Sequence, residues 1–393
     1  MRRYLPALLT IGAILAWLFV GALKALPVLA KLTSFALHTQ DEVENAAGSD
    51  YTHFPGVTLP AAPEVIVDDA VIVAIEDAFE KNRLTQTLEQ DDYRQWLMLF
   101  QNKQSDALET IAETLRNTRP RYPNGEEKLY QFYYIVSGLG LYPQLNEGVD
   151  FNTQVVAWHR ANKPAYTAAI LIATRGNETA WSARGYAFAE DTPADQLAQF
   201  TQLKTYSREW LDRIATRGAQ ADPMFYLAVM DTNFSTELIT ESDHETFLEG
   251  VRRYPDFLPL YRPMAGQCMS RWFGAPDDLK YFAAWAEAQH PDSIAPNVIY
   301  AVIAQTAVSS KHDPPKTFQE HGLSWPHIKA GYVANIKQGH FTPLALNWFF
   351  RLAYAYEDKP TAAVLTSLMS AHYQAKAWNS DAEFQQALQW AKH

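Results

Sequence analysis

Apolar residues return at offsets of zero, three, four and seven along most of the chain, beginning near Asp91. This spacing places the apolar side chains on one face of a helix, where a neighbouring helix can bury them. The clearest series are Tyr93, Trp96, Leu97 and Phe100; Leu108, Ile111, Ala112 and Leu115; Leu129, Phe132, Tyr133 and Val136; Leu346, Phe349, Phe350 and Ala353; and Phe384, Ala387, Leu388 and Ala391. No comparable series alternates in the way that predicts strands. The pattern therefore predicts an all-α fold.

The most apolar stretch outside the N-terminal segment runs from Pro164 to Ala189. Proline suits the first turn of a helix, and residues 165–173 follow it with almost no polar interruption. A helix that is apolar on every side must be surrounded by other helices, so we expect this one at the centre of the fold. Arg175-Gly176 resembles a helix end, which would place Trp181 and Arg184 on one face of a second helix.

Other start and stop signals agree with short helices joined by short turns. Ser380 and Glu383 have the spacing of a capping box, and Arg217-Gly218 resembles a helix end. Such a pattern, sustained over about 300 residues, predicts antiparallel helical hairpins stacked in a curved array. The tetratricopeptide (TPR) signature at its 34-residue period is absent. We therefore predict a degenerate TPR-like array, forming a body over residues 65–393.

The N-terminal segment is strongly apolar. Residues 4–23 contain no charged residue, and as a helix they would span about 30 Å, the thickness of the hydrocarbon core of a bilayer. We expect an uncleaved signal-anchor helix at about residues 4–23, within a membrane anchor formed by residues 1–31. A cleaved signal peptide and a buried helix are the alternatives.

The segment after the anchor is acidic and rich in Pro and Gly. No Lys or Arg occurs between Lys31 and Lys81, and the composition of residues 32–64 predicts an extended linker. An acidic stretch gains nothing from the anionic cytoplasmic leaflet, so we expect a single-pass protein of a bacterial inner membrane with a periplasmic body. The opposite orientation stays open. Residues 65–73 form either a short strand pair or the start of a helix that ends near Arg83.

Composition and motifs narrow the classes of function. The net charge of −11 and the lack of a basic stripe argue against a nucleic-acid partner. Cys268 is the single cysteine, so a disulfide framework and a cysteine-based metal cage are excluded, and we expect it in the core. His312, His321, His327 and His340 lack metal-ligand spacing and are expected at the surface. No nucleophile elbow, phosphate loop or dinucleotide fingerprint occurs. We predict no cofactor and no metal.

Five residues are the candidates for binding a ligand or partner. Trp181 and Arg184 could hold a carboxylate or phosphate by stacking and bidentate hydrogen bonds. Arg271 and Trp272, with Trp285 beyond them, repeat this chemistry. The structural alternative is that Trp181 fills the core while Arg184 bonds the carbonyls at a helix end.

Several short motifs resemble a known bacterial family. An early Trp96 is followed by apolar residues, an A-W-x-A-R-G motif occupies residues 180–185, a Trp-x-Gly motif occupies residues 272–274, and Asn347 lies within an apolar helix. On these motifs the chain resembles domain-of-unknown-function family four-zero-three-four, over roughly residues 91–380. The resemblance implies a helical, repeat-like domain and no established activity.

These observations favour a membrane-anchored helical-repeat protein of the bacterial envelope that binds or scaffolds a protein or peptide partner. The alternative is an envelope enzyme acting on glycans or peptides, with a site that is assembled only in the fold. In that case two carboxylates would meet in a cleft beside aromatic side chains. A purely structural subunit is a third reading. We lean towards a protein that is not an enzyme.

Overall fold

A computed structural model describes most of the body of the chain. The described residues are 54, 57–59, 61–138, 150–162, 166–185, 191–234, 241–269, 272, 274–275, 277–289, 294–308 and 321–393. The chain divides into two compact units, Met1–Tyr51 and Thr52–His393, and all of these residues belong to the second.

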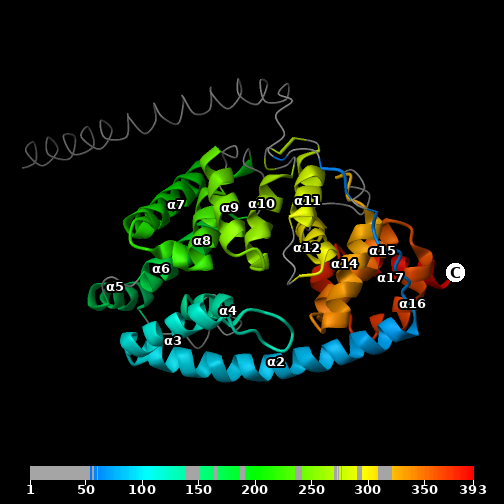
Figure 1. Cartoon of the computed structure of the whole chain (residues 1–393), viewed down its shortest axis with the longest axis horizontal. Coiled ribbons are helices and arrows are strands. Elements are labelled where there is room, and N and C mark those ends of the chain that lie inside the picture. The colour runs from blue at the N-terminus through cyan, green and yellow to red at the C-terminus, as the bar shows by residue number, and fades with distance from the viewer. Residues whose placement is uncertain are drawn as a thin grey trace, which may run out of the picture. The chain divides into compact units, whose positions relative to one another are not determined.

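The described part of the body is all-helical, which confirms the predicted fold class. It contains fifteen α-helices and no β-strand (Figure 1). The α-helices are α2 (Asp69–Gln101), α3 (Ser105–Thr118), α4 (Lys128–Val136), α5 (Phe151–Ala161), α6 (Thr167–Arg184), α7 (Ala194–Ala215), α8 (Pro223–Asn233), α9 (Glu241–Arg253), α10 (Tyr261–Gln267), α11 (Asp278–Ala288), α12 (Pro296–Val308), α14 (Trp325–Gln338), α15 (Pro343–Ala355), α16 (Lys359–Met369) and α17 (Asp381–Lys392). Short 3₁₀ turns lie at η3 (Ala219–Ala221), η4 (Leu258–Leu260) and η6 (Ala375–Ala377).

The predicted anchor, residues 1–31, lies outside the described residues. Within the residues that the structure describes, no helix combines the length and the apolar character needed to cross a bilayer. Part of the predicted linker contacts the body. Phe54 is buried, and its ring packs against Phe247, Phe282 and Trp285 with centroids 4.7–6.2 Å apart.

Residues 65–73 begin a helix and do not form a strand pair. Asp68 is the N-cap of α2, and its carboxylate accepts hydrogen bonds from the amides of Ala70 and Val71. The helix continues to Gln101, well past the expected end at Arg83, because nothing between them stops it. Helix α2 contacts α3 and α4 and also α14 and α16, so it joins early and late parts of the body (Figure 1).

The central apolar stretch forms one helix, not two. Arg175-Gly176, predicted as a helix end, lies inside α6. Gly176 lies against α7, where an added Cβ would displace the hydroxyl of Ser207. Helix α6 ends at Gly185, whose φ of 75° suits glycine. Residues 168–173 are buried and α6 contacts α4, α5, α7 and α8, as expected of a central helix.

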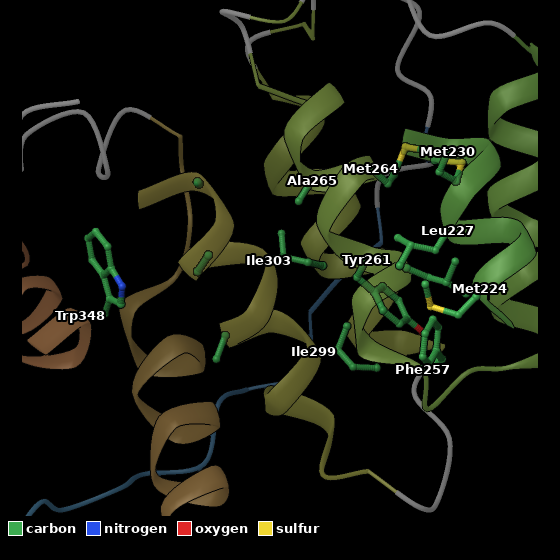
Figure 2. Packing of buried hydrophobic residues seen from close by; sticks show 14 of the residues in the cluster. Met224, Leu227, Met230, Phe257, Tyr261, Met264, Ala265, Ile299, Ile303 and Trp348 are labelled. Atoms are coloured by element: carbon green, nitrogen blue, oxygen red, sulfur yellow. The ribbon is translucent and has the colours of Figure 1, made fainter. Parts of the chain in front are cut away.

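The predicted apolar stripes are the core. Every residue of the five series is buried except Ile111, which is partly buried against the same core. The capping box is also confirmed in part, because the Glu383 amide donates to the Ser380 hydroxyl at 3.2 Å. Figure 2 shows Leu227 from α8 and Ile299 from α12 on either side of Tyr261 in α10. Most helices of the described residues pack against the next helix in the chain, whereas the regular TPR-like stacking stays a prediction.

Candidate functional site

The fold brings three of the five predicted site residues together. Trp181 lies near the end of α6, one turn before Arg184, and Trp272 lies in the connection between α10 and α11. The two indoles meet edge to face with centroids 5.7 Å apart. The Arg184 guanidinium lies 5.5 Å from the Trp181 ring and 5.6 Å from the Trp272 ring. Arg184 thus makes cation–π contacts with both rings.

Two phenylalanines complete an aromatic cluster around Trp181. Phe200 from α7 and Phe234 at the end of α8 lie 4.9 Å and 5.7 Å from the Trp181 ring. Phe234 also contacts Trp272 at 5.3 Å. Phe200 is fully buried, whereas the two indoles and Phe234 remain partly exposed. The cluster therefore has an apolar floor and an accessible aromatic edge.

A buried lysine lies beneath this edge. The ammonium of Lys204 on α7 donates to the main-chain carbonyls of Asp231 and Phe234, the latter at 3.1 Å. It also lies 5.2 Å from the Trp181 ring. Lysine near the last carbonyls of a helix is favoured by the helix dipole. Burial nevertheless lowers the pKa of Lys204 to about 8, since the interior disfavours its charged form.

Two carboxyl groups share the electrostatic environment of Lys204. Burial raises the pKa of Asp231 to about 7, and the charge of Glu178 on α6 adds to the rise while Lys204 opposes it. Partial desolvation also raises the pKa of Glu178, against the attraction of Lys204. Neither Lys204 nor Asp231 is among the site residues predicted from the sequence. The available signal was a lysine on the buried stripe of α7, four residues after Phe200.

Arg184 is placed to support the indoles. It is only 3% exposed, and its guanidinium donates to the Gly185 carbonyl at 3.4 Å. Burial lowers the pKa of Arg184. A buried guanidinium stacked between two rings holds them in position, which leaves the partly exposed edges of Trp181 and Trp272 as the contact surface.

The other two predicted site residues do not join this cluster. Trp285, on α11, packs against Phe247 and Phe282 at 5.9 Å and 6.3 Å, close to Phe54. It belongs to a second aromatic cluster. Arg271 lies outside the described residues, so its predicted pairing with Trp272 stays a prediction.

The expectation that the histidines lie at the surface is wrong for His327. Its ring is buried, and its Nδ1 lies 2.9 Å from a carboxylate oxygen of Glu287. Asn297 donates to the same carboxylate at 2.7 Å. These residues come from α14, α11 and α12, and spacing in the sequence gives no sign that they meet. Together, Glu287, His327 and Asn297 link the three helices in the core. The described residues contain no group of three or more potential metal ligands.

Two further residues from the sequence analysis have structural roles. Cys268 is buried as expected, and burial raises the pKa of its thiol. Asn347 is fully buried, and its amide donates to the carbonyls of Pro343 and His372. Its side-chain oxygen accepts from the indole of Trp378 at 3.0 Å. These bonds occupy the side chain, which explains an Asn inside an apolar helix.

Comparisons with protein-family models, curated proteins and solved structures returned no match. The resemblance to family four-zero-three-four stays a prediction. What the Trp181 cluster does must therefore be inferred from its own geometry.

Proposed function

We propose that this chain is a membrane-anchored protein of the bacterial envelope whose body, a degenerate TPR-like helical array, binds or scaffolds a protein or peptide partner. The resemblance to family four-zero-three-four is part of the same proposal. The partner docks at the aromatic edge formed by Trp181, Trp272 and Phe234.

One observation supports this docking site. Trp181 and Trp272 are partly exposed; the buried Arg184 contacts both rings, and Phe200 packs against Trp181. Tryptophan supplies a large contact area at a small cost in conformational entropy and is enriched among the residues that dominate binding energy. Rings that are already fixed lose little further freedom when a partner binds. The geometry therefore suits an apolar or aromatic side chain of the partner, with Glu178 available at the edge to pair with a basic group.

Site-specific crosslinking tests the docking site. A photoreactive amino acid replaces Ser182, which is exposed and adjacent to Trp181, in the full chain expressed in its native envelope. We expect a crosslinked product of discrete mass that is lost when Trp181→Ala is added. The matched control places the same group at Thr110, on the exposed face of α3. Equal products from both positions, or none from position 182, would contradict the proposal.

A second candidate is an enzyme acting on envelope glycans or peptides. Lys204, Asp231 and Glu178 favour it, since groups with pKa values moved towards neutrality are common at catalytic sites. The Lys204 ammonium, however, is already bonded to two main-chain carbonyls, which leaves it little freedom to transfer a proton to a substrate. Incubation of the chain with cell-wall fragments, followed by mass spectrometry, tests this candidate. Products formed by the wild type but not by Asp231→Asn would favour the enzyme.

The membrane anchor and the periplasmic body are also part of the proposal. A C-terminal alkaline phosphatase fusion should be active in cells, because this reporter folds only outside the cytoplasm. A cytoplasmic reporter at the same position should be inactive. The opposite pair of results would place the body in the cytoplasm.

A further inference from the structure

A separate cavity lies between the ends of α5 and α7. Its volume is about 310 Å³, and it is lined by Val156, His159 and Arg160 from the α5 side and by Trp210, Arg213 and Arg217 from the α7 side. Small-molecule sites usually measure about 300–1,000 Å³, so this cavity is at the lower end of that range. None of its lining residues belongs to the Trp181 cluster.

The rim of this cavity is positively charged in a chain whose net charge is −11. Arg160, Arg213 and Arg217 are all exposed. Arg213 forms a weak, solvent-exposed pair with Glu209 at 3.4 Å. Within the described part of the chain, Arg160 and Arg217 have no carboxylate within 4.0 Å. Three arginines therefore line one cavity, and only Arg213 has an ion-pair partner among the described residues, which gives the cavity a positive lining that suits an anion.

The floor of the cavity is aromatic and buried. His159 and Trp210 are 9% and 7% exposed, and their rings meet edge to face at 5.1 Å. The Arg213 guanidinium stacks 4.8 Å from the Trp210 ring. The Trp210 indole N–H has no hydrogen-bond partner among the described residues. This N–H is itself buried, so it is closed off from the cavity, and Trp210 contributes an apolar lining instead.

The ends of helices explain part of this arrangement but not all of it. Arg160 and Arg213 lie in the last turns of α5 and α7, where cations favour the helix dipole. That effect accounts for each arginine by itself. It does not account for a cavity between them.

We propose that this cavity binds a small organic oxyanion, a carboxylate or a phosphate ester with an aromatic or aliphatic part. The oxyanion contacts the guanidiniums of Arg160 and Arg217, which match its planar oxygen pairs by bidentate hydrogen bonds. The apolar part enters between Val156 and Trp210. Arg213 holds the indole in place from the other side.

Calorimetric titration of the full chain in detergent tests the proposal with three probes: phenyl phosphate, benzoate and the neutral analogue benzamide. We expect saturable binding of phenyl phosphate or benzoate at one site, at least tenfold tighter than benzamide. Binding of phenyl phosphate alone identifies a phosphate ester, and binding of benzoate alone identifies a carboxylate. No binding of either anion above the level of benzamide would overturn the proposal.

Variants assign the binding to this cavity. The double variant Arg160→Gln, Arg217→Gln should weaken binding of the anion at least tenfold. Both positions are exposed, so the variant should still fold. Trp210→Phe leaves a smaller ring on the floor of the cavity and should weaken binding several-fold. Arg94→Gln, an exposed arginine on α2, controls for net charge. Unchanged affinity in the double variant, or an equal loss in Arg94→Gln, would overturn the assignment. Crosslinking from position 182 should be unaffected, which separates this site from the docking site.

Discussion

The two ends of α8 hold charged groups in opposite ways. At its start, Asp222 is fully buried and caps the helix through the amide of Met224 at 2.8 Å. Its second carboxylate oxygen accepts from the Arg116 guanidinium at 2.9 Å and from the Tyr133 hydroxyl at 2.6 Å. Both oxygens are therefore bonded, and the positive end of the helix dipole favours the negative charge there.

The hydrogen-bond network around Asp222 extends through Arg116 to further residues, and each of them has a partner within it. Arg116 also donates to the Thr167 hydroxyl at 2.8 Å and stacks on the Tyr166 ring at 4.6 Å. Thr167 in turn donates to Glu109, which also accepts from the Trp158 indole at 3.2 Å. Helices α3, α4, α5, α6 and α8 all contribute, so the network fixes their relative positions.

The end of α8 lacks this matching. The Asp231 carboxyl group lies at the negative end of the helix dipole, where a second negative charge is disfavoured. No basic group of the described residues lies within 4.0 Å of it, because Lys204 is bonded to main-chain carbonyls instead. The comparison teaches that a buried charge at the start of α8 depends on its partners, so removing one partner is costly. The charges at the end of α8 are less closely matched, as the docking site proposed above would allow.

Breaking the matched pair should give the largest effect on stability. Asp222→Asn leaves the buried Arg116 with only its longer ion pair to Glu109 at 3.8 Å, and we expect a loss of about 3–5 kcal/mol in the free energy of unfolding. Chemical denaturation followed by circular dichroism measures it. The control is Arg83→Ala, which breaks an exposed pair on α2 and should cost less than about 0.5 kcal/mol. Similar losses in both variants would show that the Asp222 network contributes no more to the free energy of unfolding than an exposed ion pair.

A smaller change at the same network should have an intermediate effect. Tyr133→Phe removes one hydrogen bond to the Asp222 carboxylate and leaves the ring in place. We expect a loss of about 1.5–3 kcal/mol, typical of a hydrogen bond to a charged group. Tyr206→Phe is the control, since Tyr206 is exposed on α7 and should show almost no change. A neutral Tyr133→Phe would mean that water replaces the lost hydroxyl.

Removing the charge from the unmatched end should cost less than either change. Lys204→Met keeps a flexible side chain against Trp181 and Phe200 and removes an ammonium whose burial is unfavourable. The carbonyls that lose a donor lie at a helix end. We expect a change within about 1 kcal/mol in the free energy of unfolding. A loss as large as that of Asp222→Asn would show that Lys204 is part of the structural framework and would weaken the case for a site.

The sequence predicts contacts within a helix but not the contacts between helices at the two ends of α8. Apolar stripes follow from local periodicity, so the helices and their buried faces were predictable. Trp181 and Arg184 are three apart on one helix, so their proximity was predictable too. Arg116 and Asp222 are 106 residues apart, and Lys204 and Asp231 lie on different helices, α7 and α8. Their meeting depends on tertiary packing, of which the sequence offers only the hint of charged residues on apolar helix faces.

The pH dependence of stability gives the finest test of the unmatched end. The pKa of Asp231 is raised in the folded chain, so its contribution to stability is complete below the ordinary carboxyl pKa and is lost as the pH rises through about 7. Asp231→Asn removes this loss. We expect the variant to match the wild type near pH 4 and to become relatively more stable towards pH 7, by about 1 kcal/mol or less because Asp231 is partly solvated.

The measurement is the difference in unfolding free energy between variant and wild type at each pH, in which the other titrating groups largely cancel. The pKa of Lys204 in the folded chain is about 8, so Lys204 stays mostly charged between pH 4 and pH 7. Changes in this window therefore report mainly on Asp231. Asp77→Asn, at an exposed position of α2, controls for the loss of one acidic group. If Asp231→Asn instead became less stable as the pH rises, the Asp231 carboxylate would be favourable in the fold. The two ends of α8 would then be alike in their charges, and the proposed docking site would rest on the partly exposed indoles alone.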